Sequence, residues 1–107
     1  MLLSFLLLIA CDNGEDPGQP PVAVLKAPRH CDLGAVISLD GSESTDPDDD
    51  IVLYRFIITD GTAAREVTGP RVDHTCSVQG LIEVALEVHD AKGNVRQARV
   101  VVAVRPP

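Results

Sequence analysis

The strictest pattern in the sequence is the alternation of apolar and polar side chains over residues 81–90. One face of this segment carries Ile82, Val84, Leu86 and Val88, and the other carries Glu83, Ala85, Glu87 and His89. Side chains that repeat with a period of two lie on one face of a β-strand, so the segment predicts a strand with one buried and one solvated face. Strands of this kind are typical of antiparallel sheets.

Shorter runs of β-branched residues predict further strands. They cover residues 22–26, 35–40, 51–59 and 95–104, while residues 63–75 predict two short strands. In the third run the period of two places the same-face side chains in the core, namely Val52, Tyr54, Phe56 and Ile58. Beyond the N-terminal segment, no run shows the three-and-four spacing of a helix face. The sequence therefore predicts an all-β chain, an antiparallel sandwich of about seven strands.

The first ten residues are uncharged and nearly all apolar. They are too short to span a bilayer as a helix, which needs about 20 residues, and they are typical of the apolar core of a secretory signal. Residues 8–11, Leu-Ile-Ala-Cys, resemble the lipobox of bacterial lipoprotein signals. That resemblance implies cleavage after Ala10 and a diacylglycerol on the Cys11 thiol, so we expect residues 1–10 to be a signal peptide.

Alternatives stay open for this segment. Signals of this class usually begin with lysine or arginine, whereas here the apolar run follows Met1 directly. Either the true start lies upstream of Met1 or the signal is a minimal one. The alternative to lipidation is that Cys11 is an ordinary cysteine after an uncleaved leader.

Residues 11–21 have the composition of a linker behind a lipid anchor. They are polar, contain glycine and proline, and carry no large apolar side chain. Such a segment is flexible where glycine is frequent and stiffer at Pro20 and Pro21. It would hold a domain formed by residues 22–105 away from a membrane surface.

The formal net charge of −7 restricts the partners of the chain. An acidic surface repels the phosphates of nucleic acids and of anionic lipids, and no basic patch offsets it. We therefore expect no nucleic-acid binding. Acidic residues suit metal cations or simply maintain solubility.

The three cysteines are informative if the chain is exported. Lipidation of Cys11 would leave Cys31 and Cys76, and an even pair in an oxidising compartment predicts one disulfide. The alternative is two buried free thiols.

Several motifs, taken in order, resemble the polycystic-kidney-disease (PKD) domain family. Residues 39–48, Leu-Asp-Gly-Ser-Glu-Ser-Thr-Asp-Pro-Asp, resemble the DGSxSxDPDG stretch of the family. Residues 74–80 resemble its HxY…G segment with Cys76 in place of tyrosine, and residues 84–93 resemble VxLxVxD with its turn glycine. The resemblance covers about residues 22–104 and implies an Ig-like β-sandwich.

Two departures from the family pattern bear on any shared binding surface. Asp50 takes the place of the glycine that closes the DPDG turn, and Ile57-Ile58-Thr59 replaces the usual DFG before Asp60. The chain therefore keeps the turns of the family and loses residues that a particular binding surface would need.

The resemblance also implies which cysteines pair. In the family topology Cys31 lies between the first two strands, and Cys76 lies at the end of the strand that precedes residues 81–90. Both connections lie at the same end of the sandwich, which brings the two cysteines within reach of each other. We predict a Cys31–Cys76 disulfide.

The acidic turn at residues 46–50 is the candidate metal site. In an Ig-like sandwich this loop shares one end with the strand that finishes at Asp90, and some members of the family bind calcium there. The predicted ligands are Asp46, Asp48 and Asp90, because calcium takes about six to eight oxygen ligands. The alternative is structural, with Asp40 and Asp46 accepting hydrogen bonds from the turn backbone and the other carboxylates solvated. Calcium is expected as an optional ligand, and no cofactor as a requirement.

No catalytic constellation is visible in the sequence. His30, His74 and His89 lack the spacing of a zinc site. We expect His74 to be a turn residue fixed by hydrogen bonds and the other two to lie on the surface. Ser42 and Ser44 belong to the DGSxS turn, where their hydroxyls are expected to bond the backbone rather than act as nucleophiles. We therefore expect that the protein is not an enzyme.

These observations predict a membrane-anchored, non-catalytic module of the cell envelope that contacts a protein or a glycan. This step is an analogy from the fold. Two alternatives stay open, a structural spacer or assembly subunit without a ligand, and a carbohydrate-binding accessory module of exported hydrolases. Sugars stack on exposed rings, and Tyr54 and Phe56 are expected in the core, which disfavours the glycan alternative. The expected location is the cell envelope, with inner and outer membrane both open.

Overall fold

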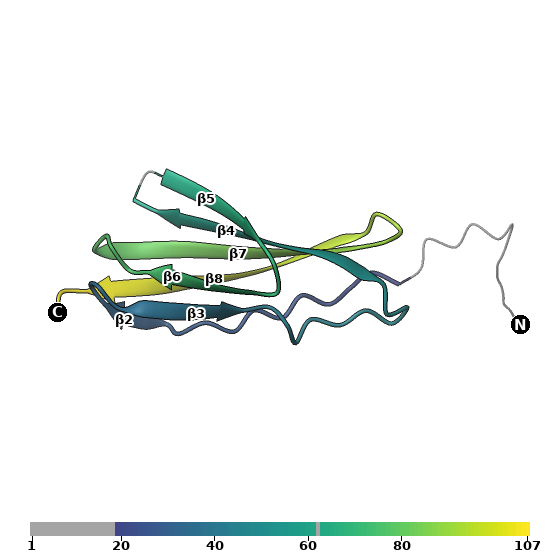
Figure 1. Ribbon diagram of the computed structural model, residues 1–107, viewed down its shortest axis with the longest axis horizontal. Helices are drawn as coiled ribbons and strands as arrows, with labels where there is room; N and C mark the ends of the chain where they lie inside the picture. Colours follow the sequence, from purple (N-terminus) through teal and green to yellow (C-terminus); the bar gives the residue numbers. More distant parts are fainter. Residues whose placement is uncertain (1–18, 62) are drawn as a thin grey trace, which may run out of the picture.

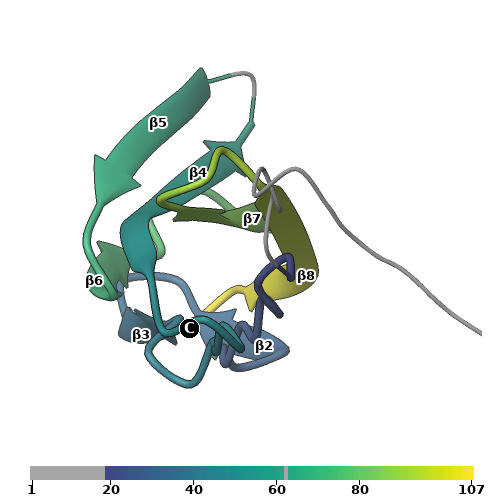
Figure 2. The ribbon, with the colours of Figure 1, turned by 90° about the vertical axis from the view of Figure 1, so that its right-hand side faces the viewer.

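The structure, a computed structural model, describes residues 19–61 and 63–107, which form seven β-strands and no helix (Figure 1). The strands are β2 (His30–Asp32), β3 (Val36–Asp40), β4 (Ile51–Asp60), β5 (Ala63–Thr68), β6 (Arg71–Thr75), β7 (Gly80–Asp90) and β8 (Val95–Arg105). They build a five-stranded sheet in the order β2-β8-β7-β4-β5 and a two-stranded sheet of β3 and β6. Figure 2 shows the two sheets facing each other in an end view. The prediction of an all-β sandwich is confirmed.

Strand β7 is the centre of the larger sheet. It pairs antiparallel with β4 on one side and with β8 on the other. The predicted inward row is fully buried, and it consists of Ile82, Val84, Leu86 and Val88. On the opposite face Glu83 stays exposed and Glu87 and His89 are half-buried, but Ala85 is buried, so the prediction of a solvated position is wrong for Ala85. The two short strands expected within residues 63–75 are β5 and β6.

Strand β4 departs from a strict alternation at its start. Ile51 pairs with Asp90 and Leu53 pairs with His89, so Val52 is the extra residue of a β-bulge. The bulge turns the Val52 side chain outward, where it is 64% exposed, and the prediction of a core position for Val52 is wrong. Beyond the bulge the predicted face is buried: Phe56 and Ile58 are core residues and Tyr54 packs against them.

Residues 22–26 do not form the predicted strand. They make two isolated antiparallel bridges, Val22 to Thr45 and Lys26 to Asp40. Between the bridges the Ser44 hydroxyl replaces a backbone partner: its Oγ accepts from the Val24 N–H at 2.9 Å and donates to the Val24 carbonyl at 3.3 Å. A side chain in this place interrupts the regular ladder of backbone bonds.

The chain then crosses to the other sheet, where β2 pairs in parallel with β8. Sequence patterns missed β2 because three residues are too few to show an alternation. Cys31 therefore lies in a strand, with Val104 as its neighbour on β8, and not in a connection between strands as the sequence predicted.

A disulfide joins Cys31 to Cys76, as predicted, which excludes the alternative of two free thiols. Both residues belong to the buried core. Cys31 lies in the five-stranded sheet, and Cys76 directly follows β6 of the two-stranded sheet, so the bond ties the two sheets together. The bridged residues are 45 positions apart. In the chain-entropy model, a disulfide that closes a loop of this length stabilises the folded state by about 4 kcal/mol.

Gly41 lets the turn after β3 lie directly on the core. An ideal Cβ atom at this position would be 2.6 Å from Cδ2 of Leu86 and 3.4 Å from Cζ of Phe56. Real Cβ atoms essentially never approach another carbon to 2.6 Å, so a larger residue fits here only if the Leu86 side chain shifts. The glycine of the DGSxS motif therefore has a packing role.

Replacing Gly41 with alanine is expected to destabilise the protein by about 1–3 kcal/mol, because the added methyl group overpacks the core against Leu86. Urea unfolding of the full-length protein measures this change. The matched control is Leu86→Ala alone and combined with Gly41→Ala. Since truncation of Leu86 removes both contacting Cδ atoms, the double variant should be more stable than the sum of the single effects predicts. Strict additivity would contradict the packing explanation.

Candidate functional site

Three carboxylates converge at the end of the sandwich where β4 begins and β7 ends. Asp46, Asp50 and Asp90 each offer one oxygen, and these oxygens all lie within 4.8 Å of one another. Asp46 and Asp50 belong to the loop between β3 and β4, and Asp90 is the last residue of β7. A hydrogen bond of 3.0 Å from the Ala91 N–H to the Asp50 carbonyl fixes the loop against the β7–β8 turn.

The acidic loop folds through its own aspartates. Asp46 Oδ1 accepts from the Asp48 N–H at 2.8 Å, and the Asp46 carbonyl accepts from the Asp49 N–H at 2.8 Å. This is an Asx turn, as the structural alternative for Asp46 predicted. Asp49 has a φ angle of 57°, in the left-handed region that favours glycine. Asp49, and not Asp50 as the sequence suggested, thus stands in the place of the turn glycine.

Asp90 is buried and strongly bonded. Its Oδ1 accepts from the N–H groups of Lys92 at 2.9 Å and Asn94 at 2.8 Å, and its Oδ2 accepts from Asn94 Nδ2 at 2.9 Å. Burial opposes the charge of Asp90, but the bonds from Asn94 and Lys92 outweigh it and lower the pKa of this carboxyl below its ordinary value. Asp90 is therefore a fixed negative charge at the end of β7.

Asp50 faces the opposite electrostatic situation. Burial, followed by the neighbouring Asp46 and the charges of Asp90 and Asp48, raises the pKa of the Asp50 carboxyl. Oδ1 of Asp50 and Oδ2 of Asp46 are buried and have no hydrogen-bond partner among the described residues. Buried carboxylate oxygens without donors are costly, so this cluster needs a proton or a cation to compensate its charge.

The predicted ligand set is only partly brought together. Asp46 and Asp90 lie in the cluster, but Asp48 is exposed and its Oδ2 accepts from the Gln19 N–H at 3.1 Å. The third member is Asp50, which the sequence analysis left out. The signal that could have identified it is its position directly before β4, whose first residue, Ile51, pairs with Asp90.

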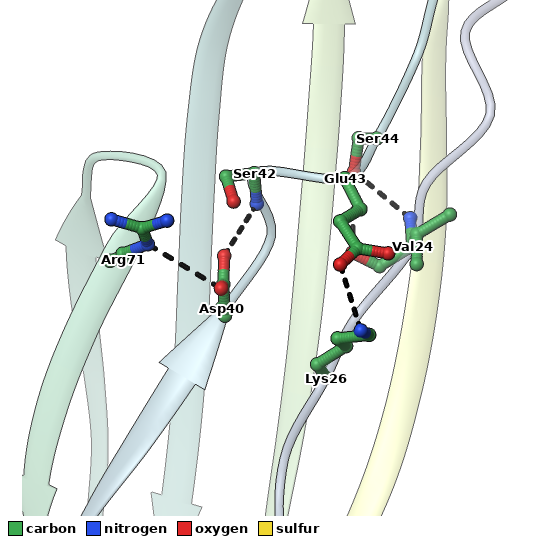
Figure 3. Close-up of polar contacts among 7 residues, drawn as sticks. All are labelled: Val24, Lys26, Asp40, Ser42, Glu43, Ser44 and Arg71. Atoms are coloured by element: carbon green, nitrogen blue, oxygen red, sulfur yellow. Dashed lines mark hydrogen bonds and ion pairs between the residues drawn. The ribbon is translucent and has the colours of Figure 1, made fainter.

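The DGSxS turn has a structural role, which Figure 3 shows. Asp40 Oδ1 accepts from the Ser42 N–H at 2.8 Å, and Arg71 Nε lies 3.4 Å from Asp40 Oδ2. The bonds from Ser42 and then the charge of Arg71 lower the pKa of Asp40. Lys26 Nζ lies 2.7 Å from Glu43 Oε2, and Glu43 raises the pKa of Lys26. The predictions that Asp40 accepts from the turn backbone and that the Ser44 hydroxyl bonds the backbone are confirmed, although the backbone partner of Ser44 is Val24, outside the turn.

The histidines lie apart from the carboxylate cluster. His30 is exposed and accepts from Arg105 Nη2 through Nδ1, and His89, on the outer face of β7, is half-buried beside Glu87. His74 is buried in β6 rather than in a turn, so that prediction is wrong in its location. His74 is nevertheless fixed by polar contacts, since Nδ1 lies 3.1 Å from Arg65 Nη2 and Nε2 lies 3.3 Å from Asp60 Oδ2.

A cleft of about 410 Å³ opens beside His74, at the disulfide end of the sandwich. Its lining comes from the end of β4, the start of β5, the end of β6 and Ser77. An arginine donates from every nitrogen, so the contact with Arg65 requires Nδ1 of His74 to accept. The other ring nitrogen, Nε2, faces Asp60 Oδ2 at 3.3 Å and makes no hydrogen bond among the described residues.

The predicted lipidation site and most of the predicted linker lie outside the described residues. Cys11 and residues 1–18 belong to this part of the chain. Within residues 19–61 and 63–107, no helix is long and apolar enough to cross a membrane.

A protein-family profile for the PKD domain matches residues 18–104 of the chain. A search of curated proteins found no match. Among solved structures, the PKD1 domain of Vibrio anguillarum Epp is 23% identical, with a TM-score of 0.69 over 84% of this chain and 99% of that domain. The PKD1 domain of the Vibrio cholerae metalloprotease PrtV is also 23% identical, with a TM-score of 0.67 over 81% of this chain and 99% of that domain.

A third similar structure comes from work on carbohydrate-binding modules of the β-sandwich superfamily. It is 23% identical, with a TM-score of 0.73 over 83% of this chain, and this chain covers 36% of its length. At this level of identity the similarity establishes a shared fold and no shared ligand.

Replacing Asp50 with asparagine is expected to raise the melting temperature at pH 7 in the presence of a chelator, because the amide removes a charge that burial and Asp46 disfavour. The folded-state pKa of Asp50 is raised, so the wild type loses stability as the pH rises from the ordinary value of 3.8 to that raised pKa. The advantage of the variant should therefore be absent below pH 3.8 and grow as the pH rises above it.

Thermal unfolding between pH 3 and pH 8 measures this difference, with the Asp48→Asn variant as the control. Asp48 carries the same charge but is exposed, so its replacement should change the melting temperature less. A lower melting temperature of the Asp50→Asn variant at pH 7 would show that the ionised carboxylate stabilises the loop.

Proposed function

Because this chain belongs to the PKD domain family, as the match over residues 18–104 shows, we propose that it is a non-catalytic interaction module held at the cell envelope by a lipid on Cys11. The observation that carries the proposal is that the carboxylate cluster and the cleft lie at opposite ends of the sandwich. The acidic end lies where the chain enters the domain, since Gln19 contacts Asp48 there. The disulfide and the cleft belong to the other end, since Figure 1 shows β2 and the end of β6, the strands next to them, opposite that entry.

The polar residues of the cleft support a binding role over catalysis. The cleft contains a histidine, a carboxylate and Ser77, the residue types of a nucleophile–base–orienter arrangement. However, Nδ1 of His74 accepts from Arg65, and Nε2, which makes no hydrogen bond among the described residues, lies 3.3 Å from a carboxylate oxygen of Asp60 rather than beside a hydroxyl. A general base needs a free nitrogen within hydrogen-bond reach of the nucleophile.

A lipid anchor explains the N-terminal sequence best. The apolar run before Cys11, the lipobox-like residues and the polar linker together have the order that an exported lipoprotein needs. The linker would then leave the disulfide end as the part of the domain that faces away from the membrane.

We assign the carboxylate cluster to calcium. Asp46, Asp50 and Asp90 would supply hard oxygen ligands, and the two unpartnered oxygens of Asp46 and Asp50 are the atoms that such an ion would compensate. A bound cation would neutralise charge in the loop before β4 and thereby stiffen the end of the domain next to the linker.

A protein partner fits the surface better than a glycan. The carbohydrate-binding modules that share the fold suggest sugars as a second candidate. Sugar sites usually contain an exposed ring. The sequence holds one tyrosine, two phenylalanines and no tryptophan. Within the described residues the rings are Phe56, which is fully buried, and Tyr54, which packs against the core.

Calcium at about 1 mM is expected to bind the full-length protein and to raise its stability by about 0.4–1.4 kcal/mol, given dissociation constants of about 0.1–1 mM for extracellular modules. Calorimetric titration and the melting temperature measure both effects. The Asp50→Asn variant should lose the heat of binding, while Asp48→Asn, outside the cluster, should keep it. No heat with the wild type, or an equal loss in both variants, would contradict the assignment of the cluster.

The Cys11→Ser variant is expected to remain unlipidated and to leave the membrane fraction, since the thiol is the atom that would carry the diacylglycerol. Fractionation and labelling with a fatty-acid analogue measure this change. The control is the double variant Cys31→Ser with Cys76→Ser, which removes the disulfide and keeps the anchor. If the Cys11→Ser variant partitions with membranes like the wild type, the chain is not a lipoprotein.

A further inference from the structure

The cleft at the disulfide end lies between two strands that are not paired with each other. Strand β5 is one edge of the five-stranded sheet, and β6 is one edge of the two-stranded sheet. They meet at Gly69 and Pro70 and diverge from there (Figure 2). Ile58 and His74 form the buried floor, while the walls carry exposed residues of both edges.

The backbone of β6 has unused hydrogen-bonding groups toward this cleft. The Gly41 N–H donates to the Pro70 carbonyl, and the Cys76 N–H donates to the Ala35 carbonyl. In an antiparallel ladder the bonded pairs alternate, so Val72 and His74 bond β3. The N–H and C=O groups of the residues between them, Arg71, Asp73 and Thr75, then point away from β3 and have no backbone partner among the described residues.

The two sheets also differ in width at this side. Two strands face five, and β5, whose Arg65 and Val67 share the inward face with Ile58 and Phe56, is the outermost strand of the larger sheet. A strand added to β6 would become the third strand of the smaller sheet and would lie beneath β5. The cleft is therefore in the position that a missing neighbour of β6 would take.

The charge of the cleft selects among extended polypeptides. Its lining contains the carboxylates of Asp60 and Asp73 against one guanidinium, and that of Arg65 already contacts His74. Asp73 is exposed and makes no ion pair with another described residue. Together with the net charge of −7, this favours a basic side chain in the occupant.

We propose that this cleft binds an extended segment of a partner protein, which adds as a strand to the free edge of β6 and places a lysine or arginine beside Asp73. Main-chain bonds to Asp73 and Thr75 give the affinity in this recognition mode, and the charge beside Asp73 gives the selectivity. The proposal deepens the role as an interaction module and is independent of the lipid on Cys11 and of calcium. Arg65 faces inward on β5, at the edge of the larger sheet. A charge at that position also protects the β5 edge from pairing with another strand.

The test uses two capped hexapeptides, one alternating lysine with valine and the other alternating glutamate with valine. Amide chemical shifts and hydrogen exchange of the full-length protein are followed during titration. The lysine peptide should shift and protect the amides of Asp73 and Thr75, and the glutamate peptide should bind about two- to fivefold more weakly, as expected for the loss of one exposed ion pair. No binding, equal binding of the two peptides, or shifts confined to other strands would overturn the proposal.

Variants at the two edges identify the strand that binds. Asp73→Pro removes an N–H that points into the cleft and should abolish binding, whereas Glu66→Pro makes the matched change on the free edge of β5 and should leave it intact. If Asp73→Pro does not fold, Asp73→Lys decides the matter, because it should reverse the preference from the lysine to the glutamate peptide. An unchanged preference would exclude Asp73 from the site. A result against this cleft leaves the calcium and lipidation tests unaffected.

Discussion

The burial of one face of β7 is the constraint on which the rest of the structure depends. Its four inward side chains are fully buried, and each contributes about 1.5–3 kcal/mol through burial alone. The strand pairs along nearly its whole length on both sides, so it fixes the register of β4 and β8 at once. Because a slip by one residue would turn the apolar row toward solvent, only one register is stable. Asp90 and the disulfide end take their positions from this strand.

The narrow second sheet creates the asymmetry of the molecule. On one side, the disulfide from Cys31 to Cys76 closes the sandwich by tying β2 to the end of β6. On the other side, no strand of the described residues pairs with the second edge of β6. The covalent link at Cys76 and the pairing with β3 thus both hold β6 in place, while its other edge stays open. A stable free edge is the condition for a specific strand-binding site, because a mobile edge would have to be ordered on binding.

The sequence predicted features that depend on neighbouring residues, and it failed for features that depend on contacts between residues far apart in the chain. The alternation in β7 and most of β4 is local. It identified Phe56 and Ile58 in β4 and the inward row of β7 as core residues. Val52 was placed wrongly because a bulge depends on the partner strand, which the local pattern does not contain. Residues 22–26 have strand composition, but Ser44, 20 positions away from Val24, takes over the central hydrogen bonds. Asp50 was missed for the same reason, since only the pairing of Ile51 with Asp90 brings it to the cluster.

The fixed register also limits how the acidic end can respond to its own charge. Asp50 is followed directly by Ile51, which is paired with Asp90, and the Ala91 N–H holds the Asp50 carbonyl. The strand cannot slide to separate the carboxylates without moving Phe56 and Ile58 out of the core. Rotation of the Asp90 side chain would break its bonds to Lys92 and Asn94. The repulsion therefore has to be relieved at Asp50 itself, by a proton or by a cation, and the same strand that builds the core sets up this requirement.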